Sequence, residues 1–304
     1  MPPRSLHSYV GKFDVMPFEP DLGVDTDIRG LDVLELPRSE TAPRLGRFWR
    51  SAWPKVAAAA IGFSVWQLVA ISGWKPTYVL PPPAEVLGRL VDQAATADFW
   101  QAVVITMQRA ALGFGAALAI GTVVGLAVSQ SRFVRSAAGS LITGFQSMPS
   151  IVWFPFAILL FGLNETAILF VIVLGAAPAI ANGLISGIDH IPPIILRAGR
   201  VLGARGPNAW RSVVLPAALP GYVAGLKQGW AFAWRSLMAG ELLVIIAERP
   251  SIGVRLQFAR ELSDAAGLQA MMIVVLIIGL LMDGLFFGTL ERRIRRNRGL
   301  VATR

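Results

Sequence analysis

Charged side chains interrupt the long apolar stretches of this sequence, and Arg109, Arg235 and Glu241 are three of them. A guanidinium group presents a planar fork of hydrogen-bond donors, which suits the oxygens of a sulfonate, nitrate or carboxylate. A charge at membrane depth is costly and usually faces a partner or water, so both arginines are candidate contacts for an anionic solute. The alternatives are that Arg109 snorkels from the outer end of its span, and that Arg235 pairs with Glu241 or a neighbouring helix.

Other kinds of site chemistry are excluded by residue type. The sequence has no cysteine, it has only two histidines, His7 and His190, and its acidic residues are not clustered. Disulfides, thiol catalysis and cysteine metal sites are therefore excluded, and no metal centre is expected. A membrane enzyme would also lack a constellation of residues to carry its reaction.

The composition places these side chains in an integral membrane protein. Of the 304 residues, 54% are hydrophobic and 15% are charged, whereas an ordinary soluble domain has about 25% charged residues. The formal net charge of +9 is concentrated before the first and after the last apolar stretch, as the positive-inside rule predicts. The basic stripe with interleaved exposed aromatics that is typical of nucleic-acid binding is missing.

The apolar stretches predict an all-α, polytopic membrane fold with six transmembrane helices. An uncharged run of about 20 residues spans a bilayer core. The predicted spans are 56–74, 110–131, one broken or kinked helix within 136–164, 166–188, 223–246 and 265–282, the last reaching Leu290 if Asp283 lies inside the helix. Residues 84–100 predict an amphipathic helix on the outer surface. Small residues of the second span predict close helix packing; they are Gly113, Gly115, Gly121 and Gly125.

Six spans put both termini on one side of the membrane. Twenty of the 28 Lys and Arg residues fall on that side and five on the other, so both termini are predicted to be cytoplasmic. Residues 1–55 are polar, lack the apolar region of a signal peptide, and predict a partly ordered cytoplasmic tail. Residues 56–291 form the predicted membrane domain, and residues 292–304 form a basic cytoplasmic tail.

The third predicted span contains Pro149, Trp153 and Pro155. Where a helix is interrupted at membrane depth, the freed backbone groups must line protein or a water-filled path. These residues are therefore candidates for a translocation path with Trp153 as its gate, and Arg109, Arg235 and Glu241 are further candidates for the same path. The alternative is a kink that packs against a neighbouring helix.

The pattern of residues 189–219, the longest cytoplasmic connection, predicts a helix, a turn and a second short helical segment that ends before a proline. Residues 194–202 read as a helix, Gly203 can end it through a left-handed cap, and residues 210–215 resume it before Pro216. We interpret this pattern as a short helix lying across the membrane face. A basic surface helix that only anchors the topology is the alternative.

This connection resembles the cytoplasmic motif of permease subunits in binding-protein-dependent ABC importers. The motif reads EAA, three residues, G, nine residues, I, one residue, LP. Its spacing is kept by Arg197, Ala198, Gly199, Gly203, Val213, Leu215 and Pro216. Arg197 replaces the glutamate, and Gly199 replaces the second alanine. The resemblance implies the type I importer permease fold, in which this element is a coupling helix that seats in a groove of the ATPase subunit.

Further segments resemble the nitrate, sulfonate, taurine and bicarbonate group of these permeases. They are SMPSIVWFPFAILLFG at 147–162, TMQRAALGF at 106–114, LPPPAEV before the second span, and the 234–241 stretch of the fifth. The resemblance covers roughly residues 78–292. It implies an alkanesulfonate or taurine as substrate, with nitrate, bicarbonate, an aromatic acid or a vitamin precursor as alternatives.

The resemblance also implies the partners. The sequence has no Walker A pattern, so ATP and Mg²⁺ are expected on a separate ATPase subunit, and no cofactor is expected on this chain. Two ATPase subunits, a second permease copy forming a homodimer, an extracytoplasmic binding protein and the lipid of a bacterial inner membrane complete the expected assembly. A paralogous second permease stays open. The rival class, an ion-driven secondary transporter, predicts inverted repeats and more membrane-embedded acids than Glu241.

Overall fold

The structure, a computed structural model, describes residues 44–246 and 248–297. All regular elements among these residues are helices, so the all-α prediction is confirmed for them. From Trp53 onward the described residues belong to one compact unit. Residues 1–43 and 298–304 of the predicted tails lie outside the described residues, and the predicted domain boundaries at 55 and 291 stay predictions.

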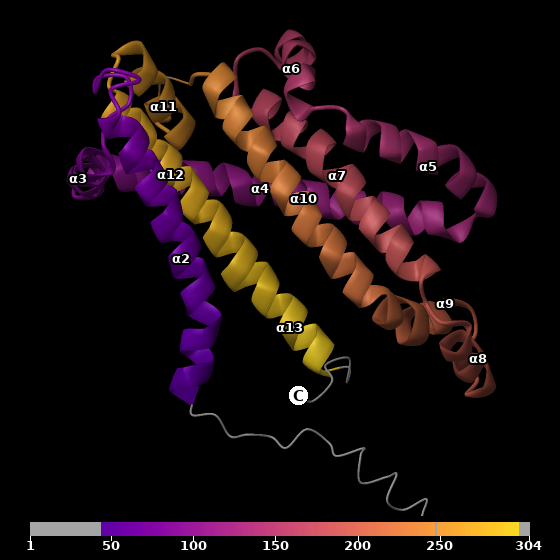
Figure 1. The fold of residues 1–304 in the computed structure, drawn as a ribbon. Coiled ribbons are helices and arrows are strands. Elements are labelled where there is room, and N and C mark those ends of the chain that lie inside the picture. Colours follow the sequence, from indigo (N-terminus) through magenta and orange to yellow (C-terminus); the bar gives the residue numbers. More distant parts are fainter. Residues whose placement is uncertain (1–43, 247, 298–304) are drawn as a thin grey trace, which may run out of the picture. The chain divides into compact units, whose positions relative to one another are not determined.

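The helices follow one another with short connections (Figure 1). The α-helices are α2 (Arg44–Ile71), α3 (Pro83–Ala94), α4 (Ala97–Gln130), α5 (Arg132–Ser147), α6 (Phe154–Phe161), α7 (Glu165–Asp189), α8 (Pro193–Val201), α9 (Gly206–Ala209), α10 (Leu215–Leu243), α11 (Ile252–Glu261), α12 (Ala265–Leu281) and α13 (Gly288–Asn297). A 3₁₀ turn, Ser150–Trp153, precedes α6. Two π-helical segments, Trp210–Val214 and Met282–Phe287, precede α10 and α13.

Four helical segments are long and apolar enough to cross a membrane. They are Trp53–Ile71, Ala97–Gln130, Glu165–Asp189 and Ala265–Ile294. The pair Phe133–Ser147 and Ser150–Phe161 passes the same test with a bend of 96°, as expected for the broken third span. α10 has 29 residues, about 44 Å at 1.5 Å per residue, but polar residues such as Lys227 and Arg235 make it less apolar. By composition the described residues hold four or five crossings, and α10 as the sixth stays a prediction.

α7 and α10 lie side by side at the centre of the helix bundle (Figure 1). Gly183 and Gly187 of α7 face Gly225 and Gly221 of α10, and a β carbon at Gly221 would lie 2.5 Å from the Cα of Gly187. Only hydrogen fits at this spacing, so the two backbones approach closely, as small residues allow between membrane helices. α8 and α9 lie at one end of this helix pair and α11 at the other.

α4 packs against the other side of α7 through the glycines that the sequence singled out. Gly113 faces Ile172, and Gly121 and Gly125 face the backbone of α7 at Ala177 and Ala181. The prediction of close packing is confirmed for these three. It is wrong for the fourth, Gly115, because a β carbon there would meet nothing within 4 Å.

Two predicted helix starts were wrong. α4 begins at Ala97 and not at residue 110, because its first turn accommodates Asp98 at the positive end of the helix dipole and Arg109 finds partners on other helices. The predicted amphipathic helix 84–100 therefore ends earlier, at Ala94. α10 begins at Leu215 and not at residue 223, because Pro216 occupies its first turn, where proline loses no helical hydrogen bond.

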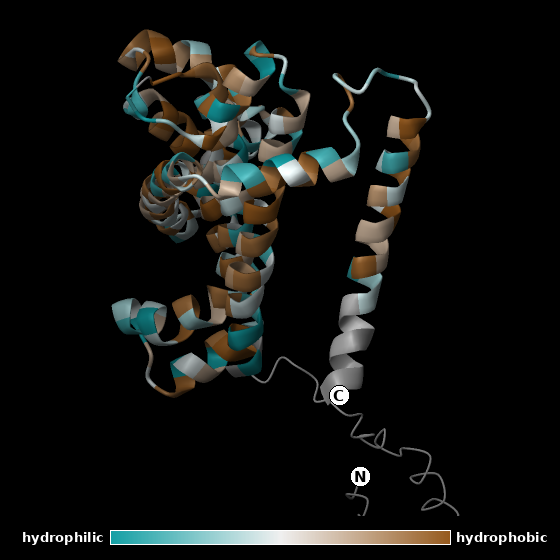
Figure 2. Ribbon diagram, turned by 90° about the vertical axis from the view of Figure 1, so that its left-hand side faces the viewer, coloured by the Kyte–Doolittle hydropathy of each residue, from teal (hydrophilic) through white to brown (hydrophobic). Residues whose placement is uncertain are grey.

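Hydropathy follows this architecture. Figure 2 shows hydrophobic residues along the long helices and hydrophilic residues gathered on short helices and connections. At one end, Arg135 of α5 forms an ion pair with Asp189 at the end of α7. The basic turn around Arg135 and the segment that follows Asp189 therefore lie at the same end of the bundle, as the predicted topology requires.

Candidate functional site

α8 ends in the left-handed cap that the sequence predicted. Gly203 has a φ of +85°, a backbone conformation that favours glycine. The Ala204 amide donates to the Gly199 carbonyl at 2.9 Å, and the Gly203 amide donates to the Arg200 carbonyl at 3.1 Å. These are the two hydrogen bonds of a Schellman motif, so the turn after α8 has a defined geometry.

Gly199 lets α8 pack against the segment that leads into α10. A β carbon at Gly199 would lie 2.8 Å from Cγ2 of Val213, in the π-helical segment before α10. Two positions of the permease motif are therefore in direct contact. The contact also explains why glycine occupies position 199, since the alanine of the motif would force Val213 to shift.

The surface that α8 presents outward is apolar and basic. Val201 and Leu202 are 87% and 86% exposed, and Arg197 and Ala198 are also exposed. A groove of about 840 Å³ separates α8 from the end of α7 and the start of α10, with Pro216 in its wall. Exposed apolar side chains beside cations are typical of a surface that another protein covers.

Arg109 lies at the centre of a buried network of charges. Its side chain is 3% exposed. Its Nη2 lies 2.6 Å from Oε1 of Glu165, and its Nη1 lies 2.9 Å from Oε1 of Glu241. Arg249 lies 3.3 Å from the same Glu165 oxygen. Arg109 and Glu241 are buried, whereas Arg249 is exposed. The two arginines and two glutamates balance each other, so the buried pair leaves no uncompensated charge.

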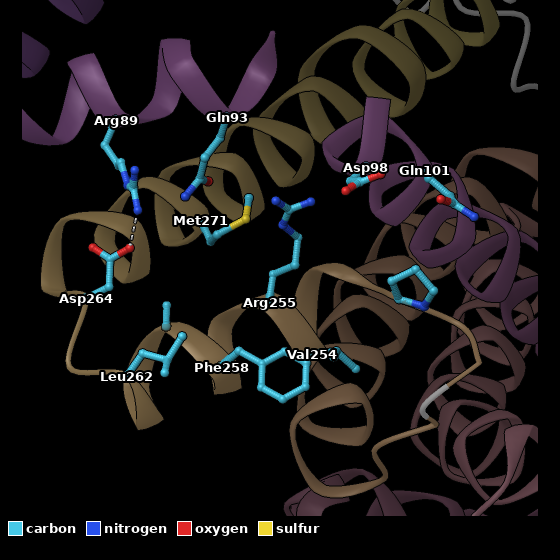
Figure 3. Close-up of a pocket in the computed structure, with 12 residues that line it drawn as sticks. Arg89, Gln93, Asp98, Gln101, Val254, Arg255, Phe258, Leu262, Asp264 and Met271 are labelled. Atoms are coloured by element: carbon cyan, nitrogen blue, oxygen red, sulfur yellow. Dashed lines mark hydrogen bonds and ion pairs between the residues drawn. The ribbon is translucent and has the colours of Figure 1, made fainter. Parts of the chain in front are cut away.

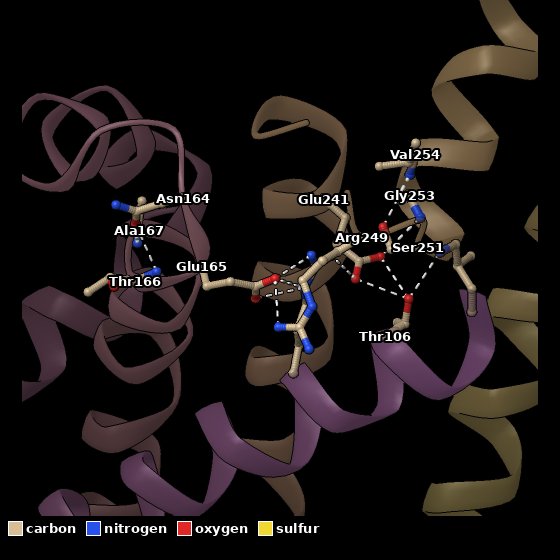
Figure 4. Close-up of polar contacts among 12 residues, drawn as sticks. Thr106, Asn164, Glu165, Thr166, Ala167, Glu241, Arg249, Ser251, Gly253 and Val254 are labelled. Atoms are coloured by element: carbon tan, nitrogen blue, oxygen red, sulfur yellow. Dashed lines mark hydrogen bonds and ion pairs between the residues drawn. The ribbon is translucent and has the colours of Figure 1, made fainter. Parts of the chain in front are cut away.

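Glu241 also holds the first turn of α11. Its Oε2 accepts a hydrogen bond from the Gly253 amide at 3.0 Å. The Thr106 hydroxyl donates to the same carboxylate at 3.0 Å and accepts from the Ile252 amide at 3.0 Å. First-turn amides have no partner within their own helix, so these bonds satisfy them. Figure 4 shows Thr106, Glu165, Glu241 and Gly253 converging from α4, α7, α10 and α11.

The alternatives that Arg109 snorkels and that Arg235 pairs with Glu241 were wrong. Arg109 does not snorkel from a helix end, because α4 begins at Ala97 and the guanidinium is enclosed by partners. Arg235 does not pair with Glu241, whose carboxylate is occupied by Arg109. Arg235 is exposed, its guanidinium lies 5.7 Å from the ring centroid of Phe232, and no carboxylate among the described residues pairs with it.

Sequence reasoning missed Thr106 and Glu165 as members of the network. Glu165 lies 56 residues from Arg109, and no local pattern links the two. Thr106 offered a weak signal, because residues three apart lie on the same helix face. Glu165 is the first residue of α7, so the start of that helix brings its carboxylate to Arg109.

Pro149, Trp153 and Pro155 lie at the bend between α5 and α6. Pro149 precedes the 3₁₀ turn, and Pro155 occupies the first turn of α6, which explains the break. The Trp153 ring stacks on Phe145 at 5.6 Å between centroids. Both prolines are exposed. Aromatic stacking thus connects α5 to the 3₁₀ turn, and the role of Trp153 as a gate stays a prediction.

An ion pair joins α3 to the start of α12. Nη2 of Arg89 lies 2.9 Å from Oδ2 of Asp264, which also caps α12 by accepting from the Gly267 amide at 2.8 Å. Burial raises the pKa of Asp264, but the hydrogen bonds from Arg89 and Gly267 lower it more, so this pKa lies below its ordinary value.

Among the described residues, no group of three or more His, Cys, Asp or Glu side chains is arranged to hold a metal ion.

Comparison with known proteins assigns this arrangement to a family. Residues 117–296 match the model described as "Binding-protein-dependent transport system inner membrane component". The taurine transport system permease protein TauC of Escherichia coli is 30% identical, over 81% of this chain and 92% of that protein. The bicarbonate transport system permease protein CmpB of Synechococcus elongatus is 30% identical, over 66% of this chain and 70% of that protein.

The fold is shared with a solved importer. The MetNI methionine ABC transporter, in an inward-facing conformation, aligns with a TM-score of 0.51 and 22% identity, over 64% of this chain and 93% of that chain. In ABC importers the permease is a multi-pass membrane subunit, and ATP hydrolysis lies in separate subunits. The chain therefore belongs to the family of binding-protein-dependent transport system inner membrane components and is a permease subunit of an ABC importer.

Proposed function

We propose that this permease carries a small organic sulfonate, taurine or an alkanesulfonate, which a binding protein delivers from outside the cell membrane. Similarity to the taurine permease, which extends over 92% of that protein, carries this proposal. The bicarbonate permease has the same level of identity, so bicarbonate is the second candidate. The further alternatives are nitrate, an aromatic acid and a vitamin precursor. The transport mechanism would be the same for each of them, and only the transported solute would differ.

Arg235 is the proposed anion contact in the translocation path. One face of α10 carries three exposed residues spaced two helical turns apart, Gln228, Arg235 and Leu242. No described carboxylate neutralises Arg235, and an unpaired guanidinium in lipid would be costly. We therefore assign this face of α10 to the water-filled path, where the fork of donors on Arg235 meets the sulfonate oxygens.

The other predicted path residues have different proposed roles. Arg109 and Glu241 bind each other at 2.9 Å, so neither has free charge to offer a solute. We propose that they border the path as a neutral frame that fixes α4, α10 and α11. We propose that the connection between α5 and α6 forms a side of the path that can move; it contains Pro149, Trp153 and Pro155. The bend interrupts the helical hydrogen bonds there, so the two helices are not held as one rigid rod.

The segment 189–219 is proposed to couple the permease to ATP hydrolysis. Val201 and Leu202 would insert into the ATPase subunit, and the Schellman turn at Gly203 would keep α8 at a fixed angle. Force on α8 passes through the contact of Gly199 with Val213 into the segment that continues as α10. Closure of the ATPase subunits would thereby move the face of α10 that carries Arg235.

The proposed assembly follows from the same reasoning. Two copies of this permease form the path, two ATPase subunits bind ATP and Mg²⁺, and a binding protein docks on the outer side, which carries α3 and α11. Residues 1–55 and 292–304 are proposed to be cytoplasmic tails, and residues 56–291 the permease domain in the inner membrane. The ion pair of Arg135 with Asp189 supports a common side for the basic turn and the coupling segment.

Uptake into proteoliposomes that contain permease, ATPase and binding protein tests the proposal. We expect ATP-dependent taurine uptake, and a loss of about tenfold or more in Arg235→Gln, since one charge-assisted hydrogen bond contributes about 1.5–3 kcal/mol. Arg235→Lys should retain part of the uptake, and Leu242→Ala, on the same face, is the matched control. Faster uptake of bicarbonate would reassign the substrate. Unchanged uptake in assembled Arg235→Gln would refute the anion contact.

A further inference from the structure

A second polar pocket lies beside α11, apart from the groove at α8. It has a volume of about 520 Å³ and is bordered by α3, the start of α4, α11 and α12 (Figure 3). Small-molecule sites typically measure about 300–1,000 Å³. Its polar lining residues are Arg89, Gln93, Asp98, Gln101, Arg255 and Asp264.

Two of these charges are already satisfied. Arg89 and Asp264 pair with each other at 2.9 Å, and Asp264 also caps α12. This pair forms one wall of the pocket and leaves no free charge for a ligand. Any recognition must come from the remaining polar groups.

Arg255 and Asp98 have no such partner. Arg255 extends from α11 into the pocket, and Asp98 lies across the same space at the start of α4 (Figure 3). Neither side chain forms a hydrogen bond or ion pair with a described residue. One cation and one carboxylate are therefore open to the same space, and the side chain of Gln93 lines it beside them.

This charge pattern selects the ligand. A simple anion would be attracted by Arg255 and repelled by Asp98, and a simple cation would meet the reverse. We propose that the pocket binds the head of a small zwitterion, an ammonium joined by a short spacer to a sulfonate or phosphate. The oxyanion accepts hydrogen bonds from Arg255, and the ammonium donates to Asp98.

Two sources supply this chemistry. One is a free aminosulfonate, in which case the inference rests on the proposed substrate class. The other is the phosphoethanolamine head of a membrane lipid, whose acyl chains would lie against Phe258 and Leu262. These two pocket residues are 51% and 79% exposed. The oxyanion and ammonium contacts are the same for both sources, so one set of variants tests the site.

Binding is measured on the full permease–ATPase complex in nanodiscs of phosphatidylglycerol alone. We expect 2-aminoethanesulfonate and phosphoethanolamine to bind, and Arg255→Gln and Asp98→Asn each to weaken binding about tenfold or more. Ethanesulfonate, which lacks the ammonium, should bind about tenfold more weakly than 2-aminoethanesulfonate. Arg260→Gln is the matched control, because Arg260 is exposed on the same helix but does not line the pocket. Arg255 and Asp98 have no described partners, so their variants should fold, and thermal unfolding checks this.

Nanodiscs that contain phosphatidylethanolamine distinguish the sources. If the lipid is the occupant, it blocks 2-aminoethanesulfonate and co-purifies with the wild type but not with Arg255→Gln in native mass spectrometry. If the solute is the occupant, the lipid has no effect. The proposal is overturned if neither zwitterion binds, or if both variants bind like the wild type. Taurine uptake with normal rates in a variant that has lost pocket binding would leave the proposed function intact.

Discussion

Arg109 and Arg235 lie in opposite environments of the same membrane protein. Arg109 is 3% exposed and pairs with two glutamates, whereas Arg235 is exposed and has no carboxylate partner among the described residues. A buried ion contributes to a fold only while its partners stay in place. Arg109 is therefore expected to matter for stability and Arg235 for solute contact.

Arg109→Met should destabilise the permease by about 3–5 kcal/mol, because it leaves Glu241 buried without its counterion. Thermal unfolding of the purified complex measures this. Arg235→Met, which removes an exposed and unpaired cation, is the matched control and should unfold like the wild type. Adding Glu241→Gln to Arg109→Met should restore part of the loss. Equal unfolding of Arg109→Met and wild type would contradict the role of the network.

At the scale of elements, the turn after α8 joins two helices at a defined angle. Its geometry depends on one residue with positive φ, Gly203, and on one close contact, between Gly199 and Val213. A coupling element must transmit force without bending, and both features restrict bending. Substitutions there should change coupling more than they change the amount of folded protein.

Gly203→Ala should uncouple ATP hydrolysis from uptake, because a side chain at this φ costs about 1–2 kcal/mol and the cap would open. Gly203→Asn should retain more coupling, since asparagine tolerates the left-handed conformation. The ratio of solute taken up to ATP hydrolysed measures the effect. Gly88→Ala, at an exposed helical glycine with nothing within 4 Å, is the control. A wild-type ratio in Gly203→Ala would show that the cap is dispensable.

Asp264 both caps α12 and pairs with Arg89, and substitutions at this residue separate the two contributions to stability. Asp264→Ala should cost about 1 kcal/mol of stability through loss of the cap, and Asp264→Asn, which keeps a capping side chain, should cost less. Because the pKa of Asp264 is lowered in the folded protein, the carboxylate stabilises fully above its unfolded pKa of about 3.9. This contribution is lost as pH falls through the folded pKa. The stability difference between wild type and Asp264→Asn should therefore shrink on acidification below pH 4; a constant difference would contradict the assignment.

At the scale of the whole molecule, α7 and α10 connect the end that carries α8 to the end that carries α11. Their glycine-lined contact permits no side chain between Gly187 and Gly221, so the two helices are expected to move as one body. The buried network links the far end of α10 to α4 and α11. Movement of α8 should therefore reach α11 without a flexible step between them.

The complete importer should contain two permeases and two ATPase subunits. Native mass spectrometry of the complex purified through a tagged permease, co-expressed with an untagged copy, measures this. We expect the untagged copy to co-purify, because two copies enclose the proposed path. Recovery of a different permease in place of the untagged copy would indicate a heterodimer. Loss of the ATPase in a variant that lacks α8, with the permease still dimeric, would support the coupling surface.

The sequence by itself determined the class of fold and the position of α8 with the turn that ends it. Long uncharged runs must be helical in a membrane, because every backbone polar group needs an internal partner. The spacing from Ala198 through Gly203 to Pro216 is local, and a glycine that ends a helix acts on its immediate neighbours. These features depend on residues close in the chain, so sequence patterns contain them.

Only the tertiary structure decided which charges are neutralised. Glu165 and Glu241 reach Arg109 from other helices. With its charge paired, Arg109 lies inside α4, which begins at Ala97 and not at the predicted residue 110. The unpaired groups Arg255 and Asp98 likewise share a pocket although they lie on separate helices. The energy of a charge in a membrane protein depends on its neighbours in space, and these lie far apart in sequence, so no local pattern could identify them.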